Sequence, residues 1–146
     1  MTIDTREPAE RAFLVGLDQP RARFDAADSL NELASLVEAT GSVVAGRTIQ
    51  QRRAPDPHTW VGKGKASEIA AEAKRVGADV IVTDEEITPA QQRGLEDATG
   101  KRVVDRSAVI LDIFARHART KEGRVQVELA QLQYTLPRLR GMWQHL

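Results

Sequence analysis

The sequence predicts an α/β fold: a small parallel β-sheet of about four strands with flanking helices, followed by a C-terminal long-helix element. Three observations lead to this prediction. Short apolar segments alternate with segments of helical periodicity up to residue 105. One of them, DVIVT at 79–83, is nearly all apolar, as strands buried on both faces are. After residue 105 only helical patterns follow, so we expect an α/β subdomain over 1–105 and a helical subdomain over 106–146.

Turn and capping residues separate the expected elements. Strands are expected at 11–18, 43–51, 79–83 and 101–105, and helices at 27–41, 65–78 and 88–100. Gly41 and Gly77 stand where helices commonly end. The third helix has Thr88 at its N-cap, Pro89 in its first turn and Gln91 three residues after the cap, which together predict a capping box. The strand order does not follow from the sequence.

The last forty residues predict a helix over 106–120, a turn or kink at KEGR (121–124) and a second helix with an apolar stripe. Spacings of four and three residues define this leucine stripe, which consists of Val125, Leu129, Leu132, Leu136 and Leu139. Such a stripe predicts that the helix lies against another apolar surface. We expect that surface to be a partner helix beyond residue 146 or, alternatively, a second copy of the chain.

Composition restricts the class of protein. The 146 residues include no cysteine, and the three histidines lie far apart, so neither a disulfide framework nor a metal site is expected. The sequence shows no signal peptide and no apolar run of about 20 residues, which favours a cytoplasmic protein without a membrane partner. Residues 101–146 carry nine Lys/Arg and four Asp/Glu, a net of +5, while the rest carries −5. A basic end of this kind indicates a polyanionic partner or, equally, a solvated helix face.

The segment VGKGKASEI (61–69) resembles a phosphate-binding loop, but its spacing fails the test. In the motif G-x-x-x-x-G-K-[ST], Gly64 and Lys65 would need a glycine at position 59 and Ser or Thr at position 66. The sequence has Thr59 and Ala66 there, and its only asparagine, Asn31, lies outside any N-K-x-D motif. We therefore expect no GTP hydrolysis by this chain and no catalytic residues in it.

The same loop is also the candidate for a weaker nucleotide site. Its candidate residues are Gly62, Lys63, Gly64 and Lys65. Backbone N–H groups at a helix N-terminus favour anions, and the lysines would add charge. The simpler interpretation, which we favour, is a glycine turn that leads into a helix with its lysines in water. The acidic run DEE (84–86) is likewise better explained as charge near a helix N-terminus than as a metal site.

Several segments together resemble one known family. They are GKGKASEI, TPAQQRGLE and, most specifically, ILDIFARHARTKEGRVQVELAQL with its continuation to the end of the chain. From about residue 60 onward the sequence is similar to the N-terminal domain of the HflX family of ribosome-associated GTPases. The resemblance implies an α/β subdomain, then two long antiparallel helices, then a GTPase domain that binds GTP and Mg²⁺. This sequence covers the first long helix of that hairpin and not the returning helix or the GTPase domain.

The resemblance also implies a function. Members of the family bind the large ribosomal subunit in a GTP-dependent way and split or rescue stalled ribosomes under stress. The end of the helical hairpin is expected to reach rRNA near the peptidyl transferase centre. The implied rRNA-binding residues are Arg138, Arg140, Trp143 and His145, with a second basic group of Arg116, Arg119, Lys121 and Arg124. Some members are described as binding ATP through this domain, for which 62–65 is the candidate loop; a regulatory domain that restrains the GTPase domain is a further alternative.

Overall fold

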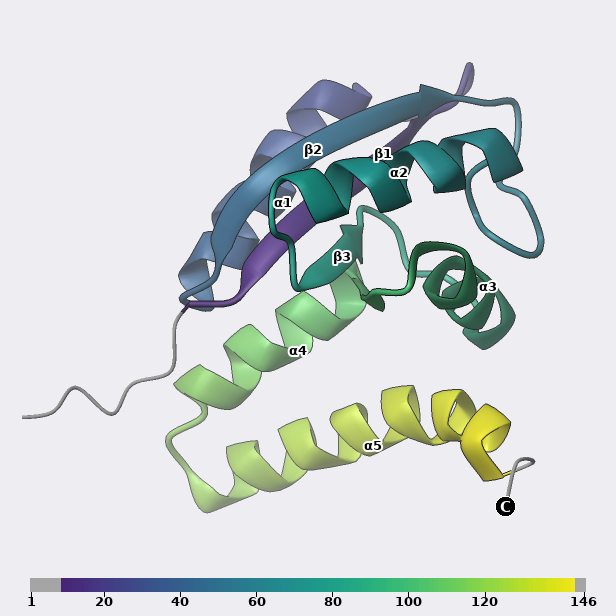
Figure 1. Cartoon of the computed structure of the whole chain (residues 1–146). Helices are drawn as coiled ribbons and strands as arrows, with labels where there is room; N and C mark the ends of the chain where they lie inside the picture. The colour runs from purple at the N-terminus through teal and green to yellow at the C-terminus, as the bar shows by residue number, and fades with distance from the viewer. Residues whose placement is uncertain (1–8, 144–146) are drawn as a thin grey trace, which may run out of the picture.

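A computed structural model describes the backbone of residues 9–143 and the side chains of residues 9–139. Its strands and helices follow the predicted alternation (Figure 1). The elements in chain order are β1 (Arg11–Asp18), α1 (Ala26–Ala39), β2 (Val43–Gln51), α2 (Lys63–Arg75), β3 (Val80–Thr83), α3 (Pro89–Thr99), β4 (Arg102–Asp105), α4 (Arg106–His117) and α5 (Lys121–Trp143). The predicted strands and the first three helices are confirmed. Their ends lie within two residues of the predicted ones, except that α2 ends at Arg75, three residues earlier than predicted.

The four strands form one parallel sheet in the order β2-β1-β3-β4. The predicted fold class is therefore confirmed, and the strand order is new information. β1 lies inside the sheet, with six consecutive residues buried, because neighbouring strands and helices cover it on all sides. β2 forms an edge, and its residues are only half-buried or exposed.

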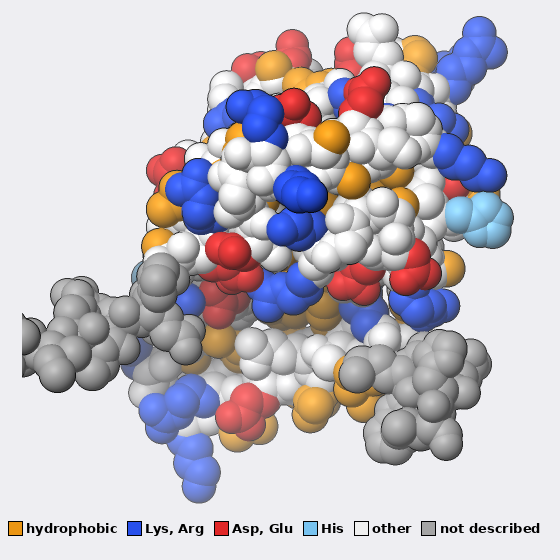
Figure 2. Space-filling view, in the orientation of Figure 1, with side chains coloured by type: hydrophobic (Ala, Val, Ile, Leu, Met, Phe, Trp, Pro, Cys, Tyr) orange, Lys and Arg blue, Asp and Glu red, His pale blue; other side chains and the backbone are white. Residues whose placement is uncertain are grey.

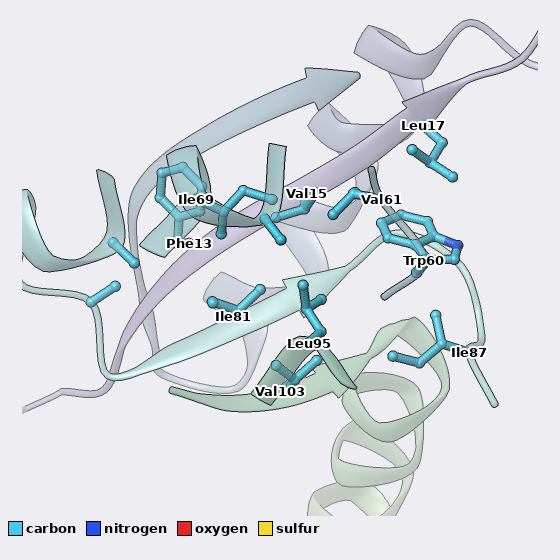
Figure 3. Packing of buried hydrophobic residues seen from close by; sticks show 13 residues of the cluster. Phe13, Val15, Leu17, Trp60, Val61, Ile69, Ile81, Ile87, Leu95 and Val103 are labelled. Carbon is cyan, nitrogen blue, oxygen red and sulfur yellow. The ribbon is translucent and has the colours of Figure 1, made fainter. Parts of the chain in front are cut away.

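Helices cover both faces of the sheet. Successive residues of β1 point to opposite faces, so Phe13 and Val15 enter one apolar cluster while Leu14 enters the other. The first cluster joins β1 to α2, α3 and the loop before α2, including the buried Trp60 (Figure 3). The second cluster joins the sheet to α1 and α4, and the buried Val109 is the contribution of α4.

The caps predicted for α3 are present. The Thr88 side chain accepts a hydrogen bond from the Gln91 backbone, and the Gln91 side chain accepts one from Thr88 N at 3.0 Å. Gly100 follows the helix with φ +68°, a left-handed conformation that side-chain-bearing residues rarely adopt. Local signals therefore fixed this helix at both ends.

The boundary between the last two helices differs from the prediction. We expected a turn at 121–124, but α4 ends at His117 and α5 already begins at Lys121. The cause is Thr120, whose hydroxyl oxygen accepts a hydrogen bond from Gly123 N at 3.0 Å and so caps the new helix. Gly123 lies in the first turn of α5, where a glycine is tolerated more easily than in a helix interior.

Four of the five residues of the leucine stripe face away from the rest of the described structure, while Leu139 is half-buried. Val125, Leu129, Leu132 and Leu136 each expose between 55% and 59% of their surface. α5 packs chiefly against α4, through a different side. None of the described helices is long and apolar enough to cross a membrane. The predicted need for an apolar partner is therefore unmet by the residues that the structure describes.

Candidate nucleic-acid interface

Four cations surround the connection between α4 and α5, and we call them the turn cluster. They are Arg116, Arg119, Lys121 and Arg124. All four are exposed, and blue side chains gather in the corresponding lower-left part of Figure 2. Arg116 pairs with Asp112 one helical turn earlier, with 3.0 Å between Nε and Oδ2. An exposed pair of this kind contributes little to stability, so the cluster remains available to a phosphate backbone.

Arg138 lies in a different environment from the one the sequence indicated. Its side chain is only 12% exposed and does not extend into solvent. Its Nη2 donates to the Ile87 carbonyl at 2.7 Å, and its Nη1 donates to the Tyr134 carbonyl at 2.9 Å. The guanidinium carbon lies 3.7 Å from the centre of the Tyr134 ring, a cation–π contact. In this arrangement Arg138 connects α5 to Ile87 and Asp105, and its charge is not exposed to a phosphate.

The other residues expected to contact rRNA at the C-terminal end of α5 lie partly or wholly outside the described residues. Arg140 and Trp143 lie within the span of α5, but their side chains are outside the described residues, and so is His145 altogether. The turn cluster lies at the opposite end of this helix, whose 23 residues at about 1.5 Å each make it roughly 35 Å long. The two groups of expected rRNA contacts are therefore separate sites.

The loop at 62–65 is built as a turn into a helix. Gly62 is the N-cap of α2, and its N–H donates to the Gln50 side chain at 2.9 Å. A Cβ at Gly62 would lie 2.7 Å from a nitrogen of Arg52, so side chains already crowd this position. Lys65 pairs with Glu68 at 3.4 Å, while Lys63 is exposed. These contacts agree with the structural interpretation, because they use groups that a phosphate would need.

Parallel sheets often bind ligands at the carboxyl ends of two neighbouring strands whose following connections run in opposite directions along the sheet. In this sheet those strands are β1 and β3. Arg106 occupies this place. Its Nη2 lies 2.6 Å from Asp84 Oδ1, and its Nη1 donates to Glu32 at 3.0 Å. Burial opposes the charge of Arg106, but the hydrogen bonds and charges of Asp84 and Glu32 raise its pKa. The sequence signals did not single out Arg106, because only the fold brings it to Asp84 and Glu32.

No group of three or more metal-ligating side chains occurs among the residues that the structure describes. The acidic run at 84–86 is divided between different roles. Asp84 is buried and pairs with Arg106, whereas Glu85 and Glu86 are exposed. The three acids of this run therefore do not act as one cluster.

Comparisons with known proteins identify the family. A family model described as "GTP-binding GTPase N-terminal" matches residues 27–115, and one described as "GTP-binding GTPase Middle Region" matches 117–146. The chain is 44% identical to the GTPase HflX of Spirochaeta thermophila over 98% of the chain, and 47% identical to that of Escherichia coli K12 over 82%. The chain belongs to the HflX family of GTPases. These matches cover 34% and 28% of the two relatives, so the chain spans about a third of their length.

Solved structures agree with the fold. A GTP-binding protein from Sulfolobus solfataricus in complex with GDP matches 92% of the chain and 40% of its own, with a TM-score of 0.66 and 24% identity. The G235S variant of a protein titled SsGBP matches with a TM-score of 0.70, also at 24% identity. At this identity the likeness supports the α/β architecture and the helical extension, and nothing about ligands.

Proposed function

We propose that this chain is the N-terminal ribosome-binding region of a GTP-dependent ribosome-splitting GTPase. The single observation that carries the proposal is the exposed turn cluster at one end of a long helix, within a chain of the HflX family. The chain contains no phosphate-binding loop motif, so GTP and Mg²⁺ belong to the GTPase domain of the longer protein. The α/β subdomain (1–105) supports the helical subdomain (106–146), which contacts the rRNA of the large subunit near the peptidyl transferase centre. The protein acts in the cytoplasm as part of the stress response.

Two groups of residues are proposed to contact rRNA. Arg140, Trp143 and His145 form the group at the C-terminal end, where arginine pairs with phosphate and tryptophan stacks on an exposed base. The turn cluster forms the second group and contacts the phosphate backbone without reading sequence. We remove Arg138 from direct contact, because Asp105, Ile87 and Tyr134 already engage it.

A subunit-pelleting experiment tests the two groups separately. One variant combines Arg119→Glu, Lys121→Glu and Arg124→Glu, and another combines Arg140→Glu with Trp143→Ala. Both should pellet less with large subunits than the wild type, and the first should lower the steepness of the salt dependence by roughly one unit per lost phosphate contact.

The matched control replaces three exposed arginines of the α/β subdomain, Arg21, Arg23 and Arg53, by glutamate. It changes the net charge by the same amount as the triple variant of the turn cluster. If the control loses as much binding as that variant, the binding depends only on net charge and the proposed interface is wrong. Wild-type binding by both test variants would refute the rRNA-binding function itself.

A regulatory function is the second candidate, and the exposed leucine stripe favours it. In the longer protein the returning helix or the GTPase domain would cover these leucines, so the domain could restrain GTP turnover. Deleting residues 1–146 from the longer protein should then change its GTP hydrolysis without ribosomes. An unchanged rate would exclude restraint. For the ATP alternative, the contacts of Gly62 and Lys65 give no support, and calorimetry with millimolar ATP decides it.

A further inference from the structure

A single buried carboxylate joins α5 to the α/β subdomain. The Asp105 side chain is fully buried at the end of β4. Its Oδ1 accepts hydrogen bonds from Ala108 N at 3.1 Å and from the Tyr134 hydroxyl at 2.8 Å. Its Oδ2 accepts one from Ile87 N at 3.1 Å and lies 3.6 Å from Arg138 Nη2. The loop before α3, the first turn of α4 and the middle of α5 therefore meet at one charge.

Burying Arg138 at this point has an energetic cost, because one of its hydrogen-bond donors is left unpaired in the part of the chain that the structure describes. Its Nε is buried without a hydrogen-bond partner among the described residues, and an unsatisfied buried donor of this kind opposes folding. The remaining contacts must outweigh that cost, namely the hydrogen bonds to two carbonyls, the ion pair with Asp105 and the Tyr134 ring below the guanidinium. Tyr134 and Arg138 are four residues apart and lie on one side of α5, which is a side other than that of the leucine stripe.

Apart from its contact with α4, α5 is only loosely packed against the rest of the chain. A groove of about 710 Å³ remains between α4, α5 and the segment 86–89. Its apolar lining includes Ile87, Pro89, Ile110, Leu111, Ala130 and Pro137. Because these surfaces do not close on one another, apolar packing alone constrains the direction of α5 weakly, and the polar contacts of Asp105 add the constraint. Three residues, 118–120, connect α4 to α5, and in Figure 1 α5 runs below α4 and α3, apart from the sheet.

We infer that Tyr134 and Arg138 are positioning residues which, through Asp105, fix the direction in which α5 extends from the α/β subdomain. Asp105 caps α4 and binds α5 with the same side chain, so one group aligns both helices with the end of β4. The purpose of this alignment rests on the proposed function. With α5 held in one direction, the residues proposed to contact rRNA near its two ends keep a fixed orientation relative to the α/β subdomain when the chain meets the ribosome. The alignment itself is a property of the chain alone.

Distances between two spin labels test the direction of α5 without ribosomes. The chain contains no cysteine, so Asp97→Cys on α3 and Thr135→Cys on α5, both at exposed positions, carry the labels. The wild-type chain should give one narrow distance distribution. Tyr134→Phe and Arg138→Met should each widen or shift it, and Arg138→Lys should restore part of the order because it keeps the charge beside Asp105.

Arg116→Met is the matched control, since it removes an exposed arginine whose described side-chain hydrogen bond goes to Asp112 of its own helix and not to α5. It should leave the distribution unchanged. Unchanged distributions in Tyr134→Phe and Arg138→Met would overturn the inference. Circular dichroism of each variant shows whether it is folded, and Tyr134→Phe, which loses one oxygen atom, decides the question if Arg138→Met does not fold.

A spectroscopic signature reports the same contact directly. Tyr134 is the only tyrosine, so ultraviolet absorbance of tyrosinate reads this side chain alone. Burial and the hydrogen bond to Asp105 raise the pKa of Tyr134 above its ordinary value of 10.0. The tyrosinate midpoint of the folded chain should therefore lie above that of the chain in urea, and Asp105→Asn should lower it. Equal midpoints in the folded and urea-unfolded wild-type chain would refute the buried Tyr134–Asp105 contact.

Ribosome binding then tests the purpose. Tyr134→Phe leaves every cation in place, yet it should weaken pelleting with large subunits by roughly five- to tenfold, as expected when the binding-competent orientation becomes a minority. Wild-type pelleting by Tyr134→Phe, in a chain whose turn-cluster variant does lose binding, would overturn the positioning function. If neither variant loses binding, the proposed rRNA interface fails, and the distance measurement still decides whether Tyr134 and Arg138 align α5.

Discussion

β1 and α5 are both rich in apolar residues, but they are held in place by different forces. Six consecutive residues of β1 are buried between two helix-covered faces. Four large apolar residues of α5 expose more than half of their surface, and its attachment to the α/β subdomain centres on the polar contacts of Asp105. The contrast teaches that the sheet and helices α1 to α4 share a buried apolar core, whereas α5 is attached largely through directional polar contacts and leaves most of its leucine stripe exposed.

The difference between the two regions should appear first in stability. Leu33 of α1 is completely buried, while Leu132 of α5 is 55% exposed. Leu33→Ala should lower the free energy of unfolding by about 2–5 kcal/mol, because it removes buried contacts and leaves a cavity. Leu132→Ala should change it by no more than about 0.5 kcal/mol. Urea unfolding followed by circular dichroism measures both, and comparable losses would show that the stripe is buried in solution, for example between two copies.

Two glycines in α2 and α3, helices that pack on the same face of the sheet, allow a second comparison between a crowded and an open position. A Cβ at Gly94 in α3 would lie 1.9 Å from the His58 carbonyl oxygen, whereas a Cβ at Gly64 in α2 would meet nothing within 4 Å. Gly94→Ala should therefore destabilise the chain by about 1–3 kcal/mol or more through overpacking.

Gly64→Ala should instead stabilise the chain by up to about 1 kcal/mol, since alanine favours the helix. Thermal unfolding of both variants gives the two signs. Gly64→Ala also bears on the nucleotide question. If it abolished ATP binding in a chain that binds ATP, the turn interpretation of 62–65 would have to be abandoned.

The features predicted correctly from the sequence are those determined by near neighbours. The cap of α3 depends on Thr88, Gln91 and Gly100, which lie within thirteen residues of one another, and the strands follow from short apolar segments. The boundary at the start of α5 was wrong because Gly123 suggests a turn more strongly than Thr120 suggests a cap. Both signals are local, and only the structure shows which one prevails.

The position of Arg138 could not be predicted from the sequence for a different reason. Its partners Ile87 and Asp105 are distant in sequence, and they meet only because β3 and β4 end side by side. A basic residue beside other basic residues suggests a polyanion-binding surface unless the fold supplies an acid for it. The turn cluster has no such partner from a distant element among the described contacts, and for these residues the prediction of an exposed basic group agrees with the structure.

Helix caps in the two regions should differ in how widely their loss is felt. Thr88→Ala removes the cap of α3, a helix that packs into the core through Leu95. It should therefore lower the free energy of unfolding of the whole chain by about 1 kcal/mol. Thr120→Ala removes the hydroxyl that caps α5 and should instead loosen its first turn alone. Hydrogen exchange separates the outcomes: faster exchange confined to the start of α5 is expected for Thr120→Ala. A global acceleration would mean that α5 unfolds together with the α/β subdomain.

The smallest effect concerns a single charge at the end of β3. The Glu85 side chain reaches the surface, but neighbouring protein atoms displace part of its water. This desolvation and the charge of Asp84 raise its pKa, and a hydrogen bond from the Trp60 side chain lowers it in part. A carboxyl group with a raised pKa in the folded state favours folding while it is protonated, and this contribution is lost as the pH rises through that pKa.

At neutral pH the charged Glu85 therefore weakens the fold slightly, and Glu85→Gln should stabilise it by less than about 0.5 kcal/mol, since solvent screens the charge. The gain should vanish under acidic conditions, where Glu85 is protonated in both states. Glu128→Gln on the exposed side of α5 serves as the control and should show no gain at either pH. A gain for Glu85→Gln that persisted in acid would assign the effect to packing and not to charge.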